Sequence, residues 1–373
     1  MKTNSIYTSS WIITFVLLMS CSKERVRQQE GLDNIAPLES SQSVMHGQAS
    51  ACSFDDGIVA SFNANFGQLP EGIALDNTGN LYASMAPLGI IVRIDCNGGT
   101  APIADIGPTP LGPGELLLGL ATDATGIVYA AMNAPGKPYN GVWAIDPQSG
   151  ETHQLPGSQQ IFFPNGLTFD PRGNLYVTST SGAPTGPGTF GPGSIWRIPP
   201  RGEAALWLSD VSLTGLVTQL TALPVPLGAN GIAYHKQVLY VANTSKYQIV
   251  KVAIQPDGSP GKPEVFINLF NPANPFAGVP DGIAVDVRGN LYVATPADHK
   301  ILRISSDGSQ ITTVADPGDQ LTNPASLVFG RTANNQKALF VTNFTAPDLP
   351  KPVTPAGPAV IKIDVGIPGN PIR

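Results

Sequence analysis

Apolar and polar positions alternate along the chain in short runs, and each run turns at a Gly-containing pair before resuming in an apolar segment. The clearest copy is residues 279–294, Val-Pro-Asp-Gly-Ile-Ala-Val-Asp-Val-Arg-Gly-Asn-Leu-Tyr-Val-Ala. Alternation that turns at Gly-Asn and resumes in Leu-Tyr-Val is typical of an antiparallel hairpin. The related copies begin at Pro70, Gly119, Pro164, Ala229 and Pro324. The pattern therefore predicts six hairpins.

A third apolar run follows every hairpin. These runs are residues 90–94, 142–145, 195–198, 249–252, 301–304 and 360–363. A fourth follows in the first five copies, for example at 264–267 and 311–314. The copies are 47, 47, 65, 51 and 44 residues apart, a period typical of propeller blades or solenoid units. Six copies of four strands predict an all-β fold, a six-bladed β-propeller.

The sixth copy lacks its fourth strand, because the chain offers no further apolar run after Ile363. Residues 57–62, Gly-Ile-Val-Ala-Ser-Phe, precede the first copy and have strand character. We therefore expect this N-terminal strand to complete the sixth blade and close the ring.

The front of the chain has the features of an export signal. Residues 11–19 form a short apolar core after Lys2, too short to span a bilayer. Leu-Met-Ser-Cys at 18–21 resembles a bacterial lipoprotein cleavage box, and the alternative is an ordinary signal with a chance Cys. We expect residues 1–21 to be a signal peptide that ends at a lipidated Cys21, because several acyl chains give a stable membrane anchor.

Residues 22–52 are rich in Gln, Ser and Glu without periodicity, so we expect a flexible tether before a propeller at 53–373. Ser22 weakly favours an outer-membrane address. The expected location is thus the cell envelope, on the outer membrane facing the periplasm, as a monomer.

Composition changes this picture little. The chain has 40 Gly and 36 Pro, which suits many turns, and only 13 % charged residues. Its net charge is −6 and no basic cluster follows the signal, which argues against nucleic acid as a partner. Cys52 and Cys96 remain besides Cys21, and in an exported protein they are either a disulfide or two free thiols.

Oxygen-bearing side chains recur at one register of the repeat. The residue just before each predicted inner strand is Glu71, Leu118, Asn165, Asn230, Asp281 or Ala325. Innermost strands line the channel, so these residues would meet at one mouth. Two carboxylates about 5 Å apart repel by roughly 3 kcal/mol at an effective dielectric of 20.

A cation would relieve this repulsion, and oxygen ligands suit Ca²⁺ or another hard divalent ion. The alternative is that Asn and Asp before Gly only serve tight turns. That alternative does not explain Glu71 or four oxygen ligands at one register. We therefore predict one divalent cation, Ca²⁺, held by Glu71, Asn165, Asn230 and Asp281.

The repeats resemble the senescence-marker-protein/gluconolactonase family of six-bladed metal-dependent lactonases, related in fold to the paraoxonases. In that family Glu in the first blade, nothing in the second, Asn in the third and fourth and Asp in the fifth surround the ion. Glu71, Leu118, Asn165, Asn230 and Asp281 match this order. The resemblance implies a metal-dependent hydrolase with Asp281 as its catalytic residue.

Several departures from the family bear on the substrate. Sugar-lactone members have Arg two residues before the third-blade Asn and Asp directly after it, where this chain has Phe163 and Gly166. Ser-Thr-Ser-Gly at 179–182 also lacks the acidic residue of those members. Paraoxonase histidines are absent from the second copy. We expect the four histidines at the surface, with His299 the one that faces the site (His46, His153, His235 and His299).

Long loops share the predicted metal face, and four apolar residues in them are candidates for a pocket wall (Leu213, Leu216, Phe270 and Phe276). Common hydrolase and nucleotide motifs are missing. Two functions remain open. The first is hydrolysis of a lactone or related ester, with the ion polarising the carbonyl and Asp281 activating water. The second is a non-catalytic propeller lipoprotein that binds a ligand or protein.

Overall fold

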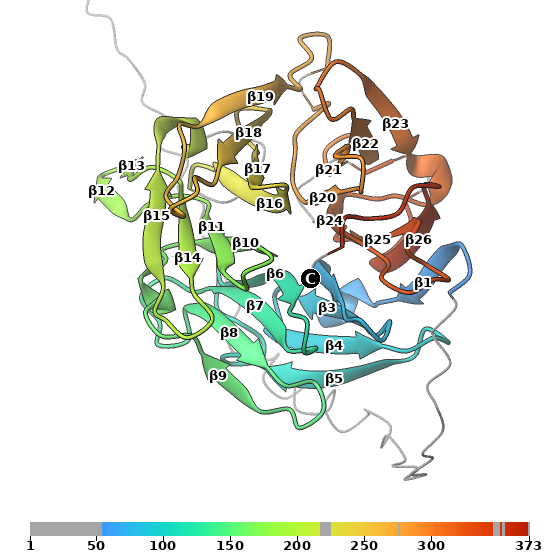
Figure 1. The fold of residues 1–373 in the computed structure, drawn as a ribbon. Helices are drawn as coiled ribbons and strands as arrows, with labels where there is room; N and C mark the ends of the chain where they lie inside the picture. Colours follow the sequence, from blue (N-terminus) through green and yellow to red (C-terminus); the bar gives the residue numbers. More distant parts are fainter. Residues whose placement is uncertain (1–53, 217–224, 275, 346–350, 353–354, 372–373) are drawn as a thin grey trace, which may run out of the picture. The chain divides into compact units, whose positions relative to one another are not determined.

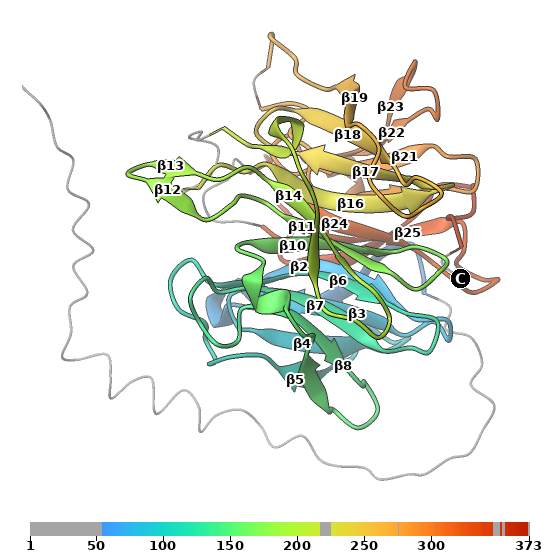
Figure 2. The ribbon, with the colours of Figure 1, turned by 60° about the vertical axis from the view of Figure 1, so that its left-hand side comes forward.

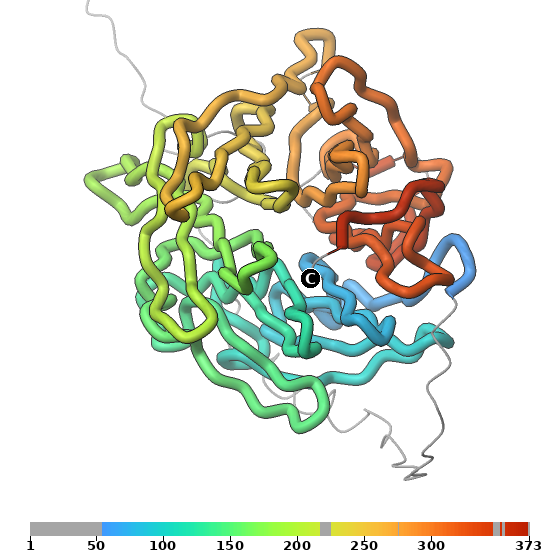
Figure 3. Tube along the Cα trace, in the orientation of Figure 1, coloured from blue at the N-terminus to red at the C-terminus, as the bar shows by residue number. Residues whose placement is uncertain are grey.

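The computed structural model describes residues 54–216, 225–274, 276–345, 351–352 and 355–371. In it six four-stranded antiparallel sheets surround a central channel, so the predicted six-bladed all-β propeller is confirmed (Figures 1 and 3). From the channel outward, blade 1 consists of β2 (Pro70–Leu75), β3 (Leu81–Met85), β4 (Ile90–Ile94) and β5 (Thr100–Asp105). Blade 2 consists of β6 (Leu116–Thr122), β7 (Val128–Asn133), β8 (Gly141–Ile145) and β9 (Thr152–Gln154). Blade 3 consists of β10 (Pro164–Phe169), β11 (Leu175–Ser179), β14 (Ser194–Ile198) and β15 (Ala205–Ser209).

The remaining blades follow the same order. Blade 4 consists of β16 (Ala229–His235), β17 (Val238–Asn243), β18 (Gln248–Ala253) and β19 (Glu264–Asn268), and blade 5 of β20 (Ile283–Val285), β21 (Leu291–Thr295), β22 (Lys300–Ile304) and β23 (Ile311–Ala315). Blade 6 contains β24 (Pro324–Phe329), β25 (Ala338–Asn343) and β26 (Ala359–Asp364).

The N-terminal strand closes the ring as the sequence pattern predicted. β1 (Gly57–Ser61) pairs antiparallel with β26 as the outer strand of blade 6, with Gly57 opposite Lys362. Lys362 also anchors the residues before β1, because its Nζ donates to the carbonyl of Phe54 at 2.6 Å and lies 3.1 Å from Asp56 Oδ1. The first and last strands of the described chain therefore pair in one blade.

An aspartate at the end of the inner strand shapes the first hairpin of four blades. Asp76 Oδ1 accepts hydrogen bonds from the backbone N–H groups of Thr78 and Asn80, and Asp76 Oδ2 accepts from the hydroxyl of Tyr82 at 2.9 Å. Gly79 between them has a φ of 94°, which a side chain would strain. The backbone-capping contacts recur at the same position in the other three blades, at Asp123, Asp170 and Asp286.

The apolar core lies between blades. The buried residues form clusters that each combine residues of two neighbouring sheets, for example blades 2 and 3 around Ala121, Val142 and Phe169. Aromatic edge contacts cross the same boundaries, with Tyr129 and Phe169 at 5.1 Å and Tyr292 and Phe329 at 5.2 Å between ring centroids. Burial of the apolar sheet faces between neighbouring blades stabilises the ring and fixes the position of each inner strand.

Two additions to the repeat were not anticipated. A short hairpin of β12 (Pro184–Gly186) and β13 (Thr189–Phe190) stands out from blade 3 (Figure 2). Residues 365–371 leave blade 6 and cross toward blades 5 and 4, where Asn370 N donates to the carbonyl of Val285 at 2.9 Å. The described helices, all short 3₁₀ turns, include none that could span a membrane.

The predicted signal peptide 1–21 with Cys21, the tether 22–52 and Cys52 lie outside the described residues. Cys96 follows β4 and is disulfide-bonded. Its partner also lies outside the described residues, so the predicted pairing with Cys52 stays a prediction.

Candidate functional site

The four predicted ligands lie on four blades at the same end of the channel. Glu71, Asn165 and Asn230 are the second residues of β2, β10 and β16, with exposed fractions of 8, 7 and 8 %. Asp281 lies two residues before β20 and is partly buried. The expectation that all four precede their strands is wrong for the first three. Their strands start one residue earlier, because Pro70, Pro164 and Ala229 already pair with the second strand.

Close backbone contacts between neighbouring inner strands connect the four positions. A Cβ added to Gly119 would lie 2.5 Å from the carbonyl oxygen of Asn165, and one added to Gly166 would lie 2.6 Å from that of Asn230. Corresponding glycines stand between blades 1 and 2, 4 and 5, and 5 and 6. The glycine after each ligand position thus lets the next blade approach, and the layer around the channel becomes compact.

The carboxylates of Glu71 and Asp281 are close enough to interact electrostatically. Burial raises the pKa of Glu71 well above its usual value, and the negative charge of Asp281 raises it further. Burial raises the pKa of Asp281 to about 7, although a hydrogen bond from the Asn230 side chain opposes this. Both carboxylates therefore carry an unfavourable charge in the absence of a cation.

The atoms left without partners fit a bound cation. Glu71 Oε2 is buried and accepts no hydrogen bond within the described part of the chain. Asn165 Nδ2 donates to Thr180 Oγ1 at 3.1 Å, and Asn230 Nδ2 donates to Thr244 Oγ1 at 3.0 Å. The amide nitrogens are thus occupied, which leaves carbonyl and carboxylate oxygens for an ion. Such a donor set suits a hard divalent cation.

The predicted gap in blade 2 is also present. Leu118 occupies the ligand position there and Ala325 occupies it in blade 6, and both are buried, with 4 and 2 % exposed. No group of three His, Cys, Asp or Glu residues suited to a metal occurs among the described residues. The candidate site instead combines two carboxylates with two amides.

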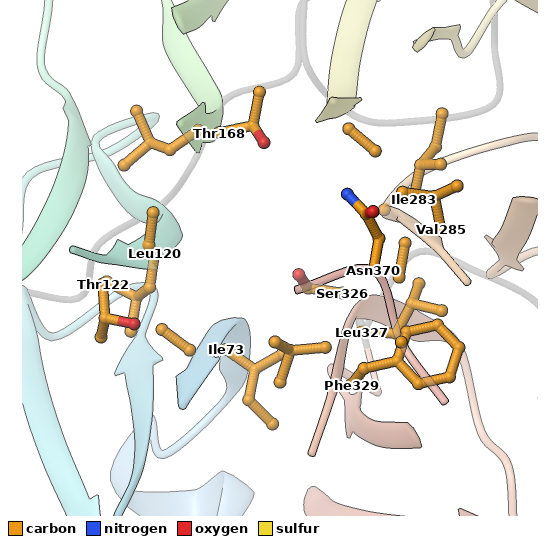
Figure 4. Close-up of a pocket in the computed structure, with 18 of the residues that line it drawn as sticks. Ile73, Leu120, Thr122, Thr168, Ile283, Val285, Ser326, Leu327, Phe329 and Asn370 are labelled. Carbon is orange, nitrogen blue, oxygen red and sulfur yellow. The ribbon is translucent and has the colours of Figure 1, made fainter. Parts of the chain in front are cut away.

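A cavity of about 250 Å³ lies in the channel beyond the ligand layer. Figure 4 shows its wall, with Ile73, Leu120, Ile283 and Leu327 from four inner strands. The C-terminal Asn370 reaches the same cavity and donates its Nδ2 to the carbonyl of Tyr234 at 3.1 Å. None of the four candidate ligands lines it, so the cavity is separate from the candidate metal site.

Two of the expected surface histidines are buried. His235 ends β16 at the far end of the channel, has 7 % exposure and contacts Asn370 through Nδ1 at 3.3 Å. His299 also has 7 % exposure, and its Nδ1 accepts from the backbone N–H of Asn323 at 3.2 Å. His153 is exposed as expected, while His46 lies outside the described residues.

The predicted apolar wall is only partly present. Leu213 is fully buried in the core between blades 3 and 4, where it packs with Tyr176 and Ile195. Leu216, Phe270 and Phe276 are exposed by 53, 50 and 46 %. Phe163, two residues before Asn165, is buried at 4 %.

The sequence interpretation missed Thr180 and Thr244, which hold the two amides. A signal was available, because both residues occupy the same position after the second strand of their blades. Their role becomes visible only once the Asn partners are in place.

Comparison with known proteins agrees with this architecture. The profile of the family described as SMP-30/Gluconolactonase/LRE-like region matches residues 140–345, more than half of the chain. The chain belongs to this family. The matched segment contains Asn165, Asn230 and Asp281, whereas Glu71 lies before it. No curated protein matches the chain significantly.

Solved structures share the fold at low identity. A luciferin-regenerating enzyme is 18 % identical with a TM-score of 0.61, and covers 84 % of this chain and 98 % of its own. The calcium-binding protein regucalcin from Agrobacterium tumefaciens is 17 % identical with a TM-score of 0.58, and the match covers 85 % of this chain and 95 % of regucalcin. A gluconolactonase from Xanthomonas campestris is 18 % identical with a TM-score of 0.56, and the match covers 88 % of this chain and 99 % of the gluconolactonase.

Proposed function

We propose that the protein is a metal-dependent hydrolase of a lactone or related ester at the cell envelope. The observation that supports this proposal is the electrostatic coupling of Glu71 with Asp281 and the hydrogen bond of Asn230 with Asp281, with Asn165 at the same register of blade 3. Membership of a gluconolactonase-related family supports a small-molecule lactone as the substrate class.

One divalent cation, Ca²⁺, is the cofactor we propose. Glu71 and Asp281 would hold it with their carboxylates, and Asn165 and Asn230 with their amide oxygens. The similarity to a structure described as a calcium-binding protein supports this choice. When bound there, a cation supplies Lewis-acid polarisation of the substrate carbonyl.

Asp281 is the residue proposed to move the proton. Its carboxylate accepts a proton from the water that attacks the lactone carbonyl, and the ring C–O bond then breaks. The same proton ends on the departing alkoxide oxygen, so the product is the open-chain hydroxy acid. The hydrogen bond from the Asn230 side chain holds the Asp281 carboxylate in place for this transfer.

The substrate we propose is apolar rather than sugar-like. Phe163 directly precedes β10 and stands two residues before Asn165. An aromatic residue therefore occupies the position where sugar-lactone members have Arg, and Gly166 replaces their Asp. Neither residue offers a side-chain hydrogen bond to sugar hydroxyls.

We propose an exported bacterial lipoprotein whose Cys21 anchors it on the outer membrane facing the periplasm, with a monomeric propeller on the tether 22–52. Nucleic acid is not a proposed partner, since the net charge is −6.

Calcium titration by calorimetry tests the proposed ion site. Glu71→Gln and Asp281→Asn remove one charge each with little change of shape, and each should weaken Ca²⁺ binding at least tenfold. Asp307→Asn is the matched control, because Asp307 is exposed in a turn and bonds only to Ser305 and Ser309 in the described structure. Unchanged affinity in the first two variants would refute the site.

A further inference from the structure

Two buried threonines stand behind the two asparagines of the proposed ion site. Thr180 and Thr244 have exposed fractions of 0 and 6 %. Their backbone N–H groups donate to the carbonyls of Phe163 at 2.9 Å and Gly228 at 3.1 Å, residues that precede each Asn by two. Each hydroxyl is thus held beside the amide of its own blade.

The six repeats provide an internal comparison. The position five residues after the start of each Leu-Tyr-Val-like run is occupied by Ala86, Asn133, Thr180, Thr244, Pro296 and Phe344. Blades 3 and 4 carry a hydroxyl there, and they are the blades with an amide in the ligand layer. The blades of Glu71 and Asp281 carry Ala86 and Pro296, and an ionised carboxylate has no donor to satisfy.

The hydrogen bonds determine which way the Asn230 amide faces. Thr244 Oγ1 donates its single proton to the carbonyl of Pro280 at 3.0 Å. The hydroxyl can then only accept from Asn230, so Nδ2 and not Oδ1 must face it. The other amide proton serves Asp281, whose ionised carboxylate only accepts. Asn230 Oδ1 is the atom that remains for a cation.

We propose that Thr244 is a positioning residue that fixes the amide orientation of Asn230, so that its Oδ1 atom faces the cation. This inference rests on the proposed metal site. Without the hydroxyl, the amide can rotate by half a turn and present its N–H groups to the ion. Loss of such an outer hydrogen bond typically lowers metal affinity 10–100-fold.

Calorimetric Ca²⁺ titration of the full-length protein tests this role. Thr244→Val keeps the shape but removes the acceptor, and we expect affinity to fall about 10–100-fold. Thr244→Ser restores the hydroxyl and should bind within about threefold of wild type. Thr122→Val is the matched control, because its hydroxyl bonds the carbonyl of Leu75 at the far end of the channel.

A thermodynamic cycle separates positioning from a general structural effect. In an Asn230→Ala background Thr244→Val should cost no further affinity, because no amide remains to orient. Equal losses in both backgrounds, or unchanged affinity in Thr244→Val alone, would overturn the inference. Absence of Ca²⁺ binding by wild type would instead refute the proposed ion site itself. Melting curves in chelator keep the test valid, since Thr244→Val loses a buried hydroxyl and should melt below wild type but still in one cooperative transition.

Discussion

Gly231 lies directly against the backbone carbonyl of Asp281 on the neighbouring blade. A Cβ at Gly231 would stand 2.2 Å from that oxygen and 2.7 Å from the Cα of Gly282, distances that real Cβ atoms do not reach. The residue before Gly231 is Asn230, so the contact sets the spacing between two proposed ligands. Packing at this boundary and geometry of the site are therefore coupled.

Gly231→Ala should consequently separate blades 4 and 5 at the ion layer. We expect a loss of about 1–3 kcal/mol in the free energy of unfolding, because the backbone must move to admit the methyl group. Calcium affinity should fall at least tenfold. Gly357→Ala is the control, since nothing lies within 4 Å of its added Cβ. Equal melting temperatures and calcium affinities for the two variants would contradict the coupling.

Phe163 should govern which lactone is accepted. Phe163→Ala removes the aromatic ring proposed to contact an apolar substrate, and kcat/KM for an aliphatic lactone should fall about tenfold or more. The value for a gluconolactone should change little. Leu206→Ala, an exposed position on β15, is a control for apolar truncation. An equal proportional loss for both lactones would show that Phe163 serves packing alone.

His235 should make the fold less stable in acid. Burial lowers the pKa of its imidazole, while the contact with Asn370 raises it less. The unfolded chain then binds more protons between the lowered pKa and about 6.5. The free energy of unfolding should rise with pH through that window and lose this contribution as pH falls.

Urea unfolding from pH 5 to pH 8 measures the effect. His235→Gln should flatten the pH dependence by at most about 1.4 kcal/mol per pH unit, the limit for one group. His153→Gln, at an exposed position, should leave it unchanged. A His235→Gln curve parallel to wild type would contradict the assignment.

The disulfide of Cys96 should stabilise the first blade. Cys96→Ser should lower the free energy of unfolding by about 2–4 kcal/mol, mainly because the unfolded chain gains freedom. Peptide mapping of the unreduced protein identifies the partner, which we predict to be Cys52. A Cys96 peptide linked to Cys21 would disprove that pairing and the lipidation of Cys21 together.

The sequence was sufficient for the repeat architecture because its signals are local. Alternation, a Gly-Asn turn and the missing fourth strand after Ile363 together predicted the hairpins and the closure by residues 57–62. The register of Glu71, Asn165, Asn230 and Asp281 likewise placed them on one layer, since each repeat folds alike.

Features that depend on contacts between blades were not predictable in this way. The burial of His235 results from residues 365–371, which cross to blade 4 and contact it through Asn370. No local sequence pattern predicts that these residues cross to another blade. Leu213 looked like a pocket residue because it lies in a long loop, yet it packs into the core between blades 3 and 4. Thr180 and Thr244 have ordinary sequence surroundings and acquire a role only beside their Asn partners.

The most direct test of the proposed function is the hydrolysis of an aliphatic lactone by wild type and Asp281→Asn, with Ca²⁺ and with chelator. We predict turnover by wild type that chelator abolishes and Ca²⁺ restores. Asp281→Asn should be slower by a factor on the order of 10²–10⁴ or more, because the proton acceptor is lost. Equal, chelator-insensitive rates for the two proteins, or no turnover by wild type that binds Ca²⁺, would contradict metal-dependent hydrolysis at this site.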